Sequence, residues 1–187
     1  RRIMLQGFQL EKVVYKGASV PRENHFIALC MLGNSNIATL MAKTGSIPGG
    51  VDAKDRLGHT PLFYASTRGL KEAVTALIEA GADINVESNE GVTPLIMASH
   101  ESHLEVVKEL LRGGAAVNQA QKDGCGPLHI ASKQGHLEVV KELLRGGAAV
   151  NQAAKGGASP LHVACSKDDV EVVKELLRGG AAVNQAR

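Results

Sequence analysis

The chain has 187 residues, of which 44% are apolar but only 3% aromatic, and its formal net charge at pH 7 is +2. The small charge and the lack of Trp argue against a nucleic-acid partner, because such partners need phosphate-neutralising patches and base-stacking side chains. No apolar run reaches the roughly 18 residues of a membrane span, and no signal-peptide pattern is present, so we expect a soluble protein without a membrane partner.

The cysteine pattern indicates the redox environment and the compartment in which we expect the protein. Cys30, Cys125 and Cys165 are far apart and include no CxxC pair. This spacing indicates neither a zinc site nor a disulfide framework, and no cofactor is expected. A reducing, intracellular setting is favoured, with the cytoplasm as the expected compartment and the nucleus as the alternative. The chain begins without Met and both ends look cut from something longer.

Two weak units precede the regular part of the chain. Residues 1–24 contain GFQLEKVVYKGASV, which matches a shortened helix around Val13 and Val14 followed by a Gly-Ala turn. We interpret them as a degenerate half-repeat or cap, with an irregular flank as the alternative. Residues 25–53 match a degenerate full repeat, in which the segment 46–50 predicts an enlarged loop.

Four regular repeats follow. They cover 54–86, 87–119, 120–152 and 153–187, and their marker glycines Gly58, Gly91, Gly124 and Gly157 are 33 residues apart. After each glycine comes Thr-Pro-Leu or a variant of it. A hydroxyl residue before Pro predicts a helix start, because the hydroxyl caps free N–H groups and Pro has no N–H to leave unpaired. Each repeat is expected to contain a short helix, a tight turn, a longer helix and a Gly-Ala turn.

The most regular segment is HLEVVKELLRGGAAVNQA. It occurs at 103–120 and 136–153, and it returns at 170–186 with Val170 in place of the Leu. Leu104, Val107, Leu110 and Leu111 fall on one face of the predicted helix, whereas the charged residues lie largely on the other. The two glycines end the helix. A helix of about three turns is too short to be stable alone, so its apolar side must pack on a neighbouring copy. The sequence therefore predicts an all-α solenoid.

This pattern resembles the ankyrin repeat, whose signature is a period of 33 residues with T-P-L-H-x-A and two helices. The copy at 127–151, PLHIASKQGHLEVVKELLRGGAAVN, is similar to an ankyrin repeat along its whole length, and the resemblance covers roughly 25–186. It implies an ankyrin-repeat solenoid with short hairpins on one side. It also implies non-enzymatic protein binding or scaffolding.

The departures from the family pattern lie at capping and turn positions. The motif His is replaced by Phe63 and Ile96, the Thr by Gly126, and the inter-helix Gly by Ser102 and Asp168. The acidic hairpin residue is kept at Asp55, and its place is taken by Ser88, Gln121 and Ala154. We expect these changes to alter local hydrogen bonds and not the fold.

The histidines favour structural roles. His100 and His103 are three residues apart, but the pattern puts a turn between them, so a metal site is not expected. The resemblance implies that His129 and His162 hydrogen-bond neighbouring groups at the start of a helix.

The cysteines and the hairpin asparagines also favour structural roles. Cys165 is expected to be buried in a first helix, whereas Cys125 is expected to be more exposed, as a candidate reactive thiol with nothing nearby to activate it. Asparagines in similar positions of ankyrin proteins can be hydroxylated, but hydrogen bonding within the hairpin is the expected role here. These asparagines are Asn85, Asn118, Asn151 and Asn184.

The resemblance also implies a partner-binding surface on the concave side, made by hairpins and first helices. Carrying the family positions across gives Arg56, Leu57, His59, Thr67, Arg68, Asn89, Glu90, Val92, His100, Glu101, Lys122, Asp123, Cys125, Lys133, Gln134, Lys155, Gly156, Ala158, Ser166 and Lys167. No catalytic, metal-binding or cofactor-binding residue is predicted.

The copies differ from one another mainly at this surface. Segments 121–135 and 154–168 differ in most places, although the second helices that follow are identical apart from Leu137 and Val170. This divergence fits a surface tuned for contact; drift where packing tolerates change is the alternative. Positive charge gathers toward the C-terminal repeats, so we expect a protein or peptide partner that is acidic there.

Alternative functions and assembly states remain open at this point. The chain could be the targeting array of a larger enzyme, or a structural or engineered solenoid without a partner. The last helix repeats the apolar pattern without polar capping residues. We therefore expect a monomer, or weak end-to-end association through the uncapped C-terminal repeat.

Overall fold

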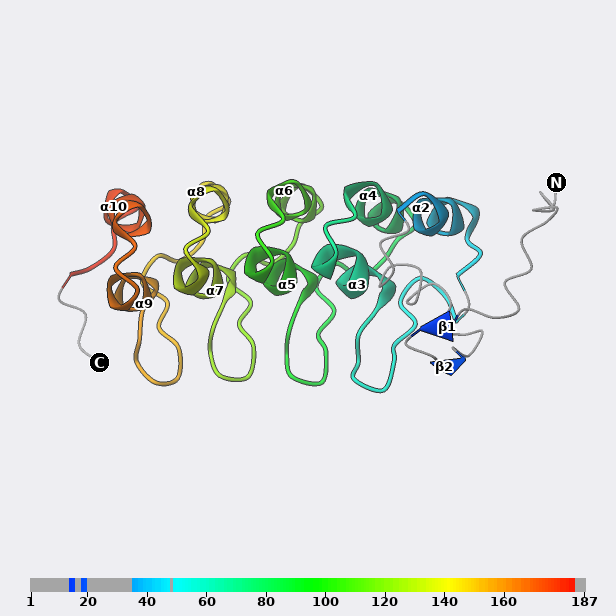
Figure 1. The fold of residues 1–187 in the computed structure, drawn as a ribbon, viewed down its shortest axis with the longest axis horizontal. Helices are drawn as coiled ribbons and strands as arrows, with labels where there is room; N and C mark the ends of the chain where they lie inside the picture. The colour runs from blue at the N-terminus through cyan, green and yellow to red at the C-terminus, as the bar shows by residue number, and fades with distance from the viewer. Residues whose placement is uncertain (1–13, 16–17, 20–34, 48, 184–187) are drawn as a thin grey trace.

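Two parallel rows of helices make up the chain in the computed structural model, which describes residues 14–15, 18–19, 35–47 and 49–183. Figure 1 shows the rows side by side, with loops projecting beyond one of them, and its labels are used below. The first helices are α3 (Pro61–Thr67), α5 (Pro94–His100), α7 (Pro127–Gln134) and α9 (Pro160–Ser166). The second helices are α2 (Ser35–Thr44), α4 (Lys71–Glu79), α6 (Leu104–Arg112), α8 (Leu137–Arg145) and α10 (Val170–Arg178).

Each helix packs against its counterpart in the next repeat. Contacts join α3, α5, α7 and α9 in one row and α2, α4, α6, α8 and α10 in the other. The predicted all-α repeat solenoid is therefore confirmed. Within the described ranges, no helix is long and apolar enough to cross a membrane.

The N-terminal region differs from its helical interpretation where it is described. β1 (Val14–Tyr15) and β2 (Ala18–Ser19) form a small antiparallel pair in which Val14 lies opposite Ser19 and Tyr15 opposite Ala18. Val14 is therefore not helical, because it lies in a strand that pairs with Ala18–Ser19. The other residues of 1–24 lie outside the described part of the chain, so the proposed half-repeat or cap stays a prediction.

The loop after α2 is longer than its counterparts. The Ser46 N–H donates to Met41 O just as Ala82 N–H donates to Leu77 O, so these points are equivalent. After Ser46 the next hairpin begins at Asp55, whereas after Ala82 the next hairpin begins sooner, at Ser88. The extra residues fall in the segment predicted to be enlarged, while the repeat boundaries themselves stay a prediction.

The core lies between the two rows and between successive repeats. In α6, Val107 and Leu110 are fully buried, as the helical pattern predicts, but Val106 is also only 1% exposed. Leu104 and Leu111 are half-buried. The buried face of α6 therefore differs from the predicted apolar face. The reason is that α6 contacts α4, α5 and α8, and so packs on more than one side.

Hydroxyl caps start the first helices where the sequence predicts them. Thr60 Oγ1 accepts the N–H of Phe63, Thr93 Oγ1 that of Ile96, and Ser159 Oγ that of His162. In each case Pro follows at the first helical position. These bonds satisfy N–H groups that a helix start otherwise leaves unpaired.

The start of α7 lacks this cap and leaves a histidine without a partner. Gly126 provides no hydroxyl, and the buried Nδ1 of His129 makes no hydrogen bond to any described residue. In α9, by contrast, His162 Nδ1 lies 2.8 Å from Ser159 Oγ. The predicted hydrogen bonding is therefore right for His162 and wrong for His129. Burial, together with nearby Lys133, lowers the pKa of His129, so the neutral imidazole is favoured.

Two inter-helix turns adopt a left-handed backbone without glycine. Ser102 has φ 62° and Asp168 has φ 55°, where Gly69 and Gly135 occupy the equivalent places in the other repeats. A non-glycine residue in this region costs about 1 kcal/mol. The helix pairs are nevertheless formed, because the packing on both sides determines the turn.

Replacing Gly126 with Ser is expected to raise the free energy of unfolding by about 1 kcal/mol, because the hydroxyl caps α7 and gives His129 a partner. A Cβ at this position meets its nearest neighbour at 3.8 Å, an ordinary contact. Urea denaturation measures the change. Gly126→Ala is the matched control, since it adds the Cβ without the hydroxyl; equal stabilisation by both variants would contradict the explanation.

Candidate protein-binding surface

Four hairpins and the first helices form one continuous surface, called here the hairpin face (54–68, 87–101, 120–134 and 153–167). Each hairpin is closed by a backbone bond, from the N–H of Asp55, Ser88, Gln121 and Ala154 to the carbonyl of His59, Val92, Cys125 and Ala158. The loops project from the row of first helices (Figure 1). A glycine with positive φ, such as Gly58 at 79°, lets each tip turn sharply.

Neighbouring hairpin tips are bonded directly to one another. The Asn89 N–H donates to Leu57 O at 2.9 Å, and Lys122 N–H donates to Glu90 O at 3.2 Å. Lys155 N–H donates to the Asp123 carbonyl at 2.8 Å. The tips therefore hold one another in a fixed register before any partner arrives.

The hairpin asparagines link repeats at a second level. Carboxamide oxygens of Asn85, Asn118 and Asn151 accept N–H groups 31 residues further on, at 2.7–2.8 Å. Asp52 takes the same place before the first regular repeat. Their role is structural, as predicted, but the bonds run between repeats and not within one hairpin. Asn184 lies outside the described residues.

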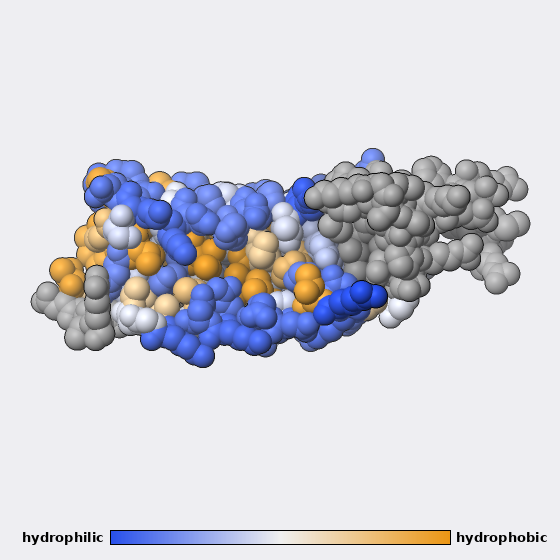
Figure 2. All heavy atoms as spheres, turned by 60° about the horizontal axis from the view of Figure 1, so that its bottom comes forward, coloured by the Kyte–Doolittle hydropathy of each residue, from blue (hydrophilic) through white to orange (hydrophobic). Residues whose placement is uncertain are grey.

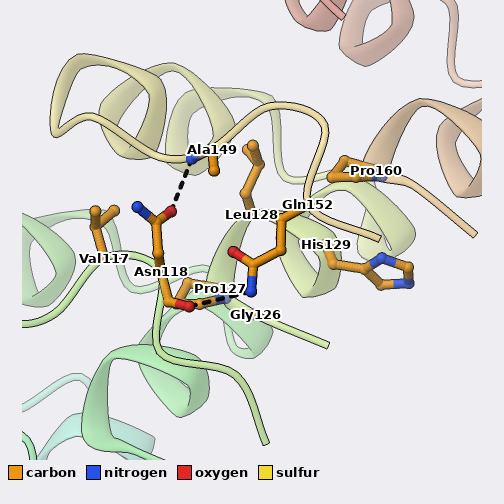
Figure 3. Close-up of a pocket in the computed structure, with 9 residues that line it drawn as sticks. All are labelled: Val117, Asn118, Gly126, Pro127, Leu128, His129, Ala149, Gln152 and Pro160. Carbon is orange, nitrogen blue, oxygen red and sulfur yellow. Dashed lines mark hydrogen bonds between the residues drawn. The ribbon is translucent and has the colours of Figure 1, made fainter. Parts of the chain in front are cut away.

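The pocket beside Asn118 is too small for a ligand. Its volume is about 10 Å³, enough for one water molecule at most. Figure 3 shows Asn118 bonded to the Ala149 N–H, and Gln152 bonded to the Asn118 carbonyl. These contacts fill the space between two repeats, so this pocket gives no support to a cofactor site.

The first regular hairpin is stabilised by a shared carboxylate. Asp55 accepts hydrogen bonds from the N–H groups of Leu57 and His59 and from the Tyr64 hydroxyl, at 2.7–2.9 Å. Burial raises the pKa of Asp55, but these hydrogen bonds outweigh it and hold the pKa below its ordinary value. The His59 ring stacks on Phe63, with centroids 4.0 Å apart.

The other hairpins replace this carboxylate in different ways. Ser88 Oγ accepts the N–H groups of Glu90 and Val92, and so substitutes for Asp55. In the next hairpin, the Asp123 carboxylate accepts the Cys125 N–H, and this bond lowers the pKa of Asp123. The departures from the family pattern thus change the donor sets while the turns remain closed.

None of the predicted contact residues is buried. Most of them are exposed, namely Arg56, Leu57, Arg68, Asn89, Glu90, His100, Glu101, Lys122, Asp123, Lys133, Gln134, Lys155, Gly156, Ser166 and Lys167. The half-buried ones are His59, Thr67, Val92, Cys125 and Ala158. Most lie on hairpin tips or at the ends of first helices, but several are tied to neighbours: His100 lies 2.9 Å from both Glu101 and Gln134.

A band of apolar side chains accompanies these polar residues. Figure 2 shows it running along the molecule between two hydrophilic margins. The first helices also carry the half-buried residues Tyr64, Met97 and Val163, each one place after the motif His position. These were not among the predicted contacts, because an apolar residue at helical spacing cannot be distinguished from core in the sequence.

A family model described as ankyrin repeats (3 copies) matches residues 12–88 and again 95–187, which together make up most of the chain. The chain belongs to the ankyrin repeat family. Ankyrin repeats generally mediate protein–protein interaction and are typically non-enzymatic.

Two histidines of this ankyrin chain, His103 and His136, connect neighbouring inter-helix turns. His100 ends α5, and His103 precedes α6 and reaches back to Thr67 O at 3.1 Å. His136 makes the same kind of contact with His100 O at 2.9 Å. Across the described segments, no group of three or more His, Cys, Asp or Glu residues is placed to hold a metal ion.

The expected exposures of the two cysteines are reversed in the structure, whereas the lack of an activating group at Cys125 agrees with the prediction. Cys165 is exposed, although Ser66, Ser99 and Ser132 are fully buried at the same place in the earlier ankyrin repeats. Those serines are covered by the helices of the following repeat, whereas α9 has no such neighbour in the described chain. Cys125 is half-buried, and burial together with Asp123 raises its pKa to about 11, so it is not an activated thiol.

Alkylation is expected to distinguish the two thiols in a Cys30→Ser background. With iodoacetamide at pH 8, Cys165 should react faster, because only the thiolate attacks and Cys125 holds little thiolate below its raised pKa. The Cys125 rate should keep rising with pH towards about 11. Peptide mass spectrometry measures both rates. Asp123→Asn removes the opposing carboxylate and should accelerate Cys125 alone; faster labelling of Cys125 than of Cys165 would contradict this assignment.

Proposed function

We propose that this ankyrin domain binds an extended segment of a partner protein along its hairpin face, which the family resemblance predicts to be concave. The observation that carries the proposal is the contrast between the last three copies: their second helices α6, α8 and α10 are identical apart from the first residue of α10, whereas the exposed positions of the hairpin face differ. Stacking on neighbouring copies explains the constancy of these helices. Nothing in the stacking requires the hairpin face to vary.

Pre-organisation supports this role. The tip-to-tip bonds, such as Lys155 N–H to Asp123 O, order the hairpins in advance. A rigid surface loses little conformational entropy when it binds, so more of the contact free energy appears as affinity. The apolar band in Figure 2 provides area to bury, and the polar margins provide specificity.

The C-terminal repeats favour an acidic partner segment. Lys133, Lys155 and Lys167 are exposed and form no ion pair with any described residue, and Lys122 has only a 3.9 Å contact to Glu90. Opposite charge on a partner would raise its association rate and fix its position. The proposal retains the intracellular setting, which rests on the cysteine pattern.

Changing Lys122, Lys133, Lys155 and Lys167 to Glu is expected to reduce capture of partner proteins from an extract of the expressing cells about tenfold, because attraction becomes repulsion. Quantitative mass spectrometry compares the captured proteins. A control with Lys43, Arg112, Arg145 and Arg178 changed to Glu has the same net charge as the hairpin-face variant. It should capture the same proteins as the wild type. Identical capture by the wild type and the hairpin-face variant would refute the acidic partner.

The outer surface of the last repeat supports weak self-association of the chain. Val170, Leu177 and Val183 are 59%, 43% and 72% exposed. An open hollow of about 410 Å³ beside them is lined by Leu161, Cys165 and Val183, among others. Exposed apolar surface of this kind favours contact with a second copy.

Sedimentation velocity under reducing conditions tests this association. The expected result is a monomer at low concentration and a growing dimer fraction at high concentration. Leu177→Lys should abolish the dimer, because a charge cannot be buried there without a partner. Lys43→Leu, distant on α2, is a control that adds apolar surface without affecting the end. A concentration-independent monomer would rule the association out.

A further inference from the structure

Charges on the second helices α6, α8 and α10 are paired within each helix. In α6, Lys108 Nζ lies 2.7 Å from Glu105, and Arg112 lies 2.8 Å from Glu109. The same pairs recur in α8 and α10 at 2.6–3.4 Å. This side of the solenoid therefore offers a partner few uncompensated charges.

The hairpin face is different, because its charges change sign from repeat to repeat. Segment 54–68 has one Asp with Lys and Arg residues, 87–101 has three Glu and no Lys or Arg, and 120–134 and 153–167 again carry exposed Lys. The order along the stack is therefore positive, negative, positive, positive.

Hydrogen bonds within segment 54–68 leave its positive charges more available than its negative one. The Asp55 carboxylate is occupied by Leu57, His59 and Tyr64, which leaves Arg56 and Arg68 without an ion pair in the described structure.

The negative repeat keeps charge available for a partner. Glu90 and Lys122 are 78% and 66% exposed and 3.9 Å apart, so water screens their attraction. Glu101 is 42% exposed and contacts His100. A partner can recognise exposed charges that make no close ion pair within the fold. Here such charges recur from repeat to repeat along the hairpin face.

We infer that the partner segment is an extended chain with a three-part charge pattern: acidic over 54–68, basic over 87–101 and acidic over 120–167. This inference rests on the proposed function and names the chemistry of its ligand. Alternate side chains of an extended segment point to opposite sides. Apolar residues can therefore enter the band seen in Figure 2 while charged residues reach the margins.

The repeat spacing sets the length of the pattern. Packed helices lie roughly 8–10 Å apart, and an extended chain advances about 3.3 Å per residue, so each repeat spans about three partner residues. The partner should therefore present about three residues of acidic character, then about three of basic character, then about six of acidic character, roughly a dozen residues in total.

A random twelve-residue peptide display library, selected on the whole chain, tests the inference. Enriched peptides should carry basic residues in a middle block flanked by acidic ones. An enriched peptide and its version with acidic middle residues are then synthesised and titrated by fluorescence anisotropy. The wild type should prefer the first about tenfold, and Glu90→Lys with Glu101→Lys should reverse the preference.

Glu79→Lys with Glu138→Lys is the matched control, since it changes the net charge equally on α4 and α8 and should leave the wild-type preference intact. Circular dichroism confirms that each variant is folded. Enriched peptides that are uniformly acidic, or whose preference ignores Glu90 and Glu101, would overturn the three-part pattern while leaving peptide binding in place. Selection that enriches nothing would overturn the proposed function as well.

Discussion

The structure depends on the burial of one short apolar helix face against the next. A helix of nine residues such as α6 is not stable alone in water. Val107 and Leu110 become fully buried only because α4, α5 and α8 surround the helix. Each repeat therefore needs its neighbours, and every second helix must keep apolar residues at its buried positions, as Val74 and Leu77 do in α4.

This division of labour leaves the hairpin face free to carry specificity. The outer charges are compensated by pairs such as Glu105 with Lys108, so they contribute solubility and little recognition. The hairpin charges have no such partners at Arg56 or Lys155 within the described structure. A surface that is rigid in its backbone and unpaired in its side chains suits selective binding of another protein.

Much of the fold could be predicted from the sequence because each prediction depended on local chemistry. A hydroxyl before Pro starts a helix wherever it occurs, and Thr60, Thr93 and Ser159 behave accordingly. Errors arose where the outcome depended on what lies next in space. Cys165 occupies a packing position, but its exposure is decided by the absence of a covering helix in the described chain.

The candidate surface was predictable only in part. Exposure of the contact positions follows from the family pattern, and none of them is buried. Which charges remain uncompensated could not be read from spacing, because Asp55 is occupied by a tyrosine nine residues away. The lack of a hydrogen-bond partner for His129 Nδ1 likewise could not be predicted from the sequence, although the sequence shows that Gly126 has no hydroxyl.

The bonds between hairpin tips have a consequence for tolerance to change. An inserted residue in one tip would move the N–H of Lys122 away from Glu90 O, and the tip beyond it would lose alignment too. Exposed side chains at these tips, such as Lys122 and Lys155, can be exchanged, but the tip glycines and the number of backbone residues cannot. This domain is therefore expected to tolerate substitutions in the hairpin tips better than insertions or deletions, because the spacing of the tips is fixed.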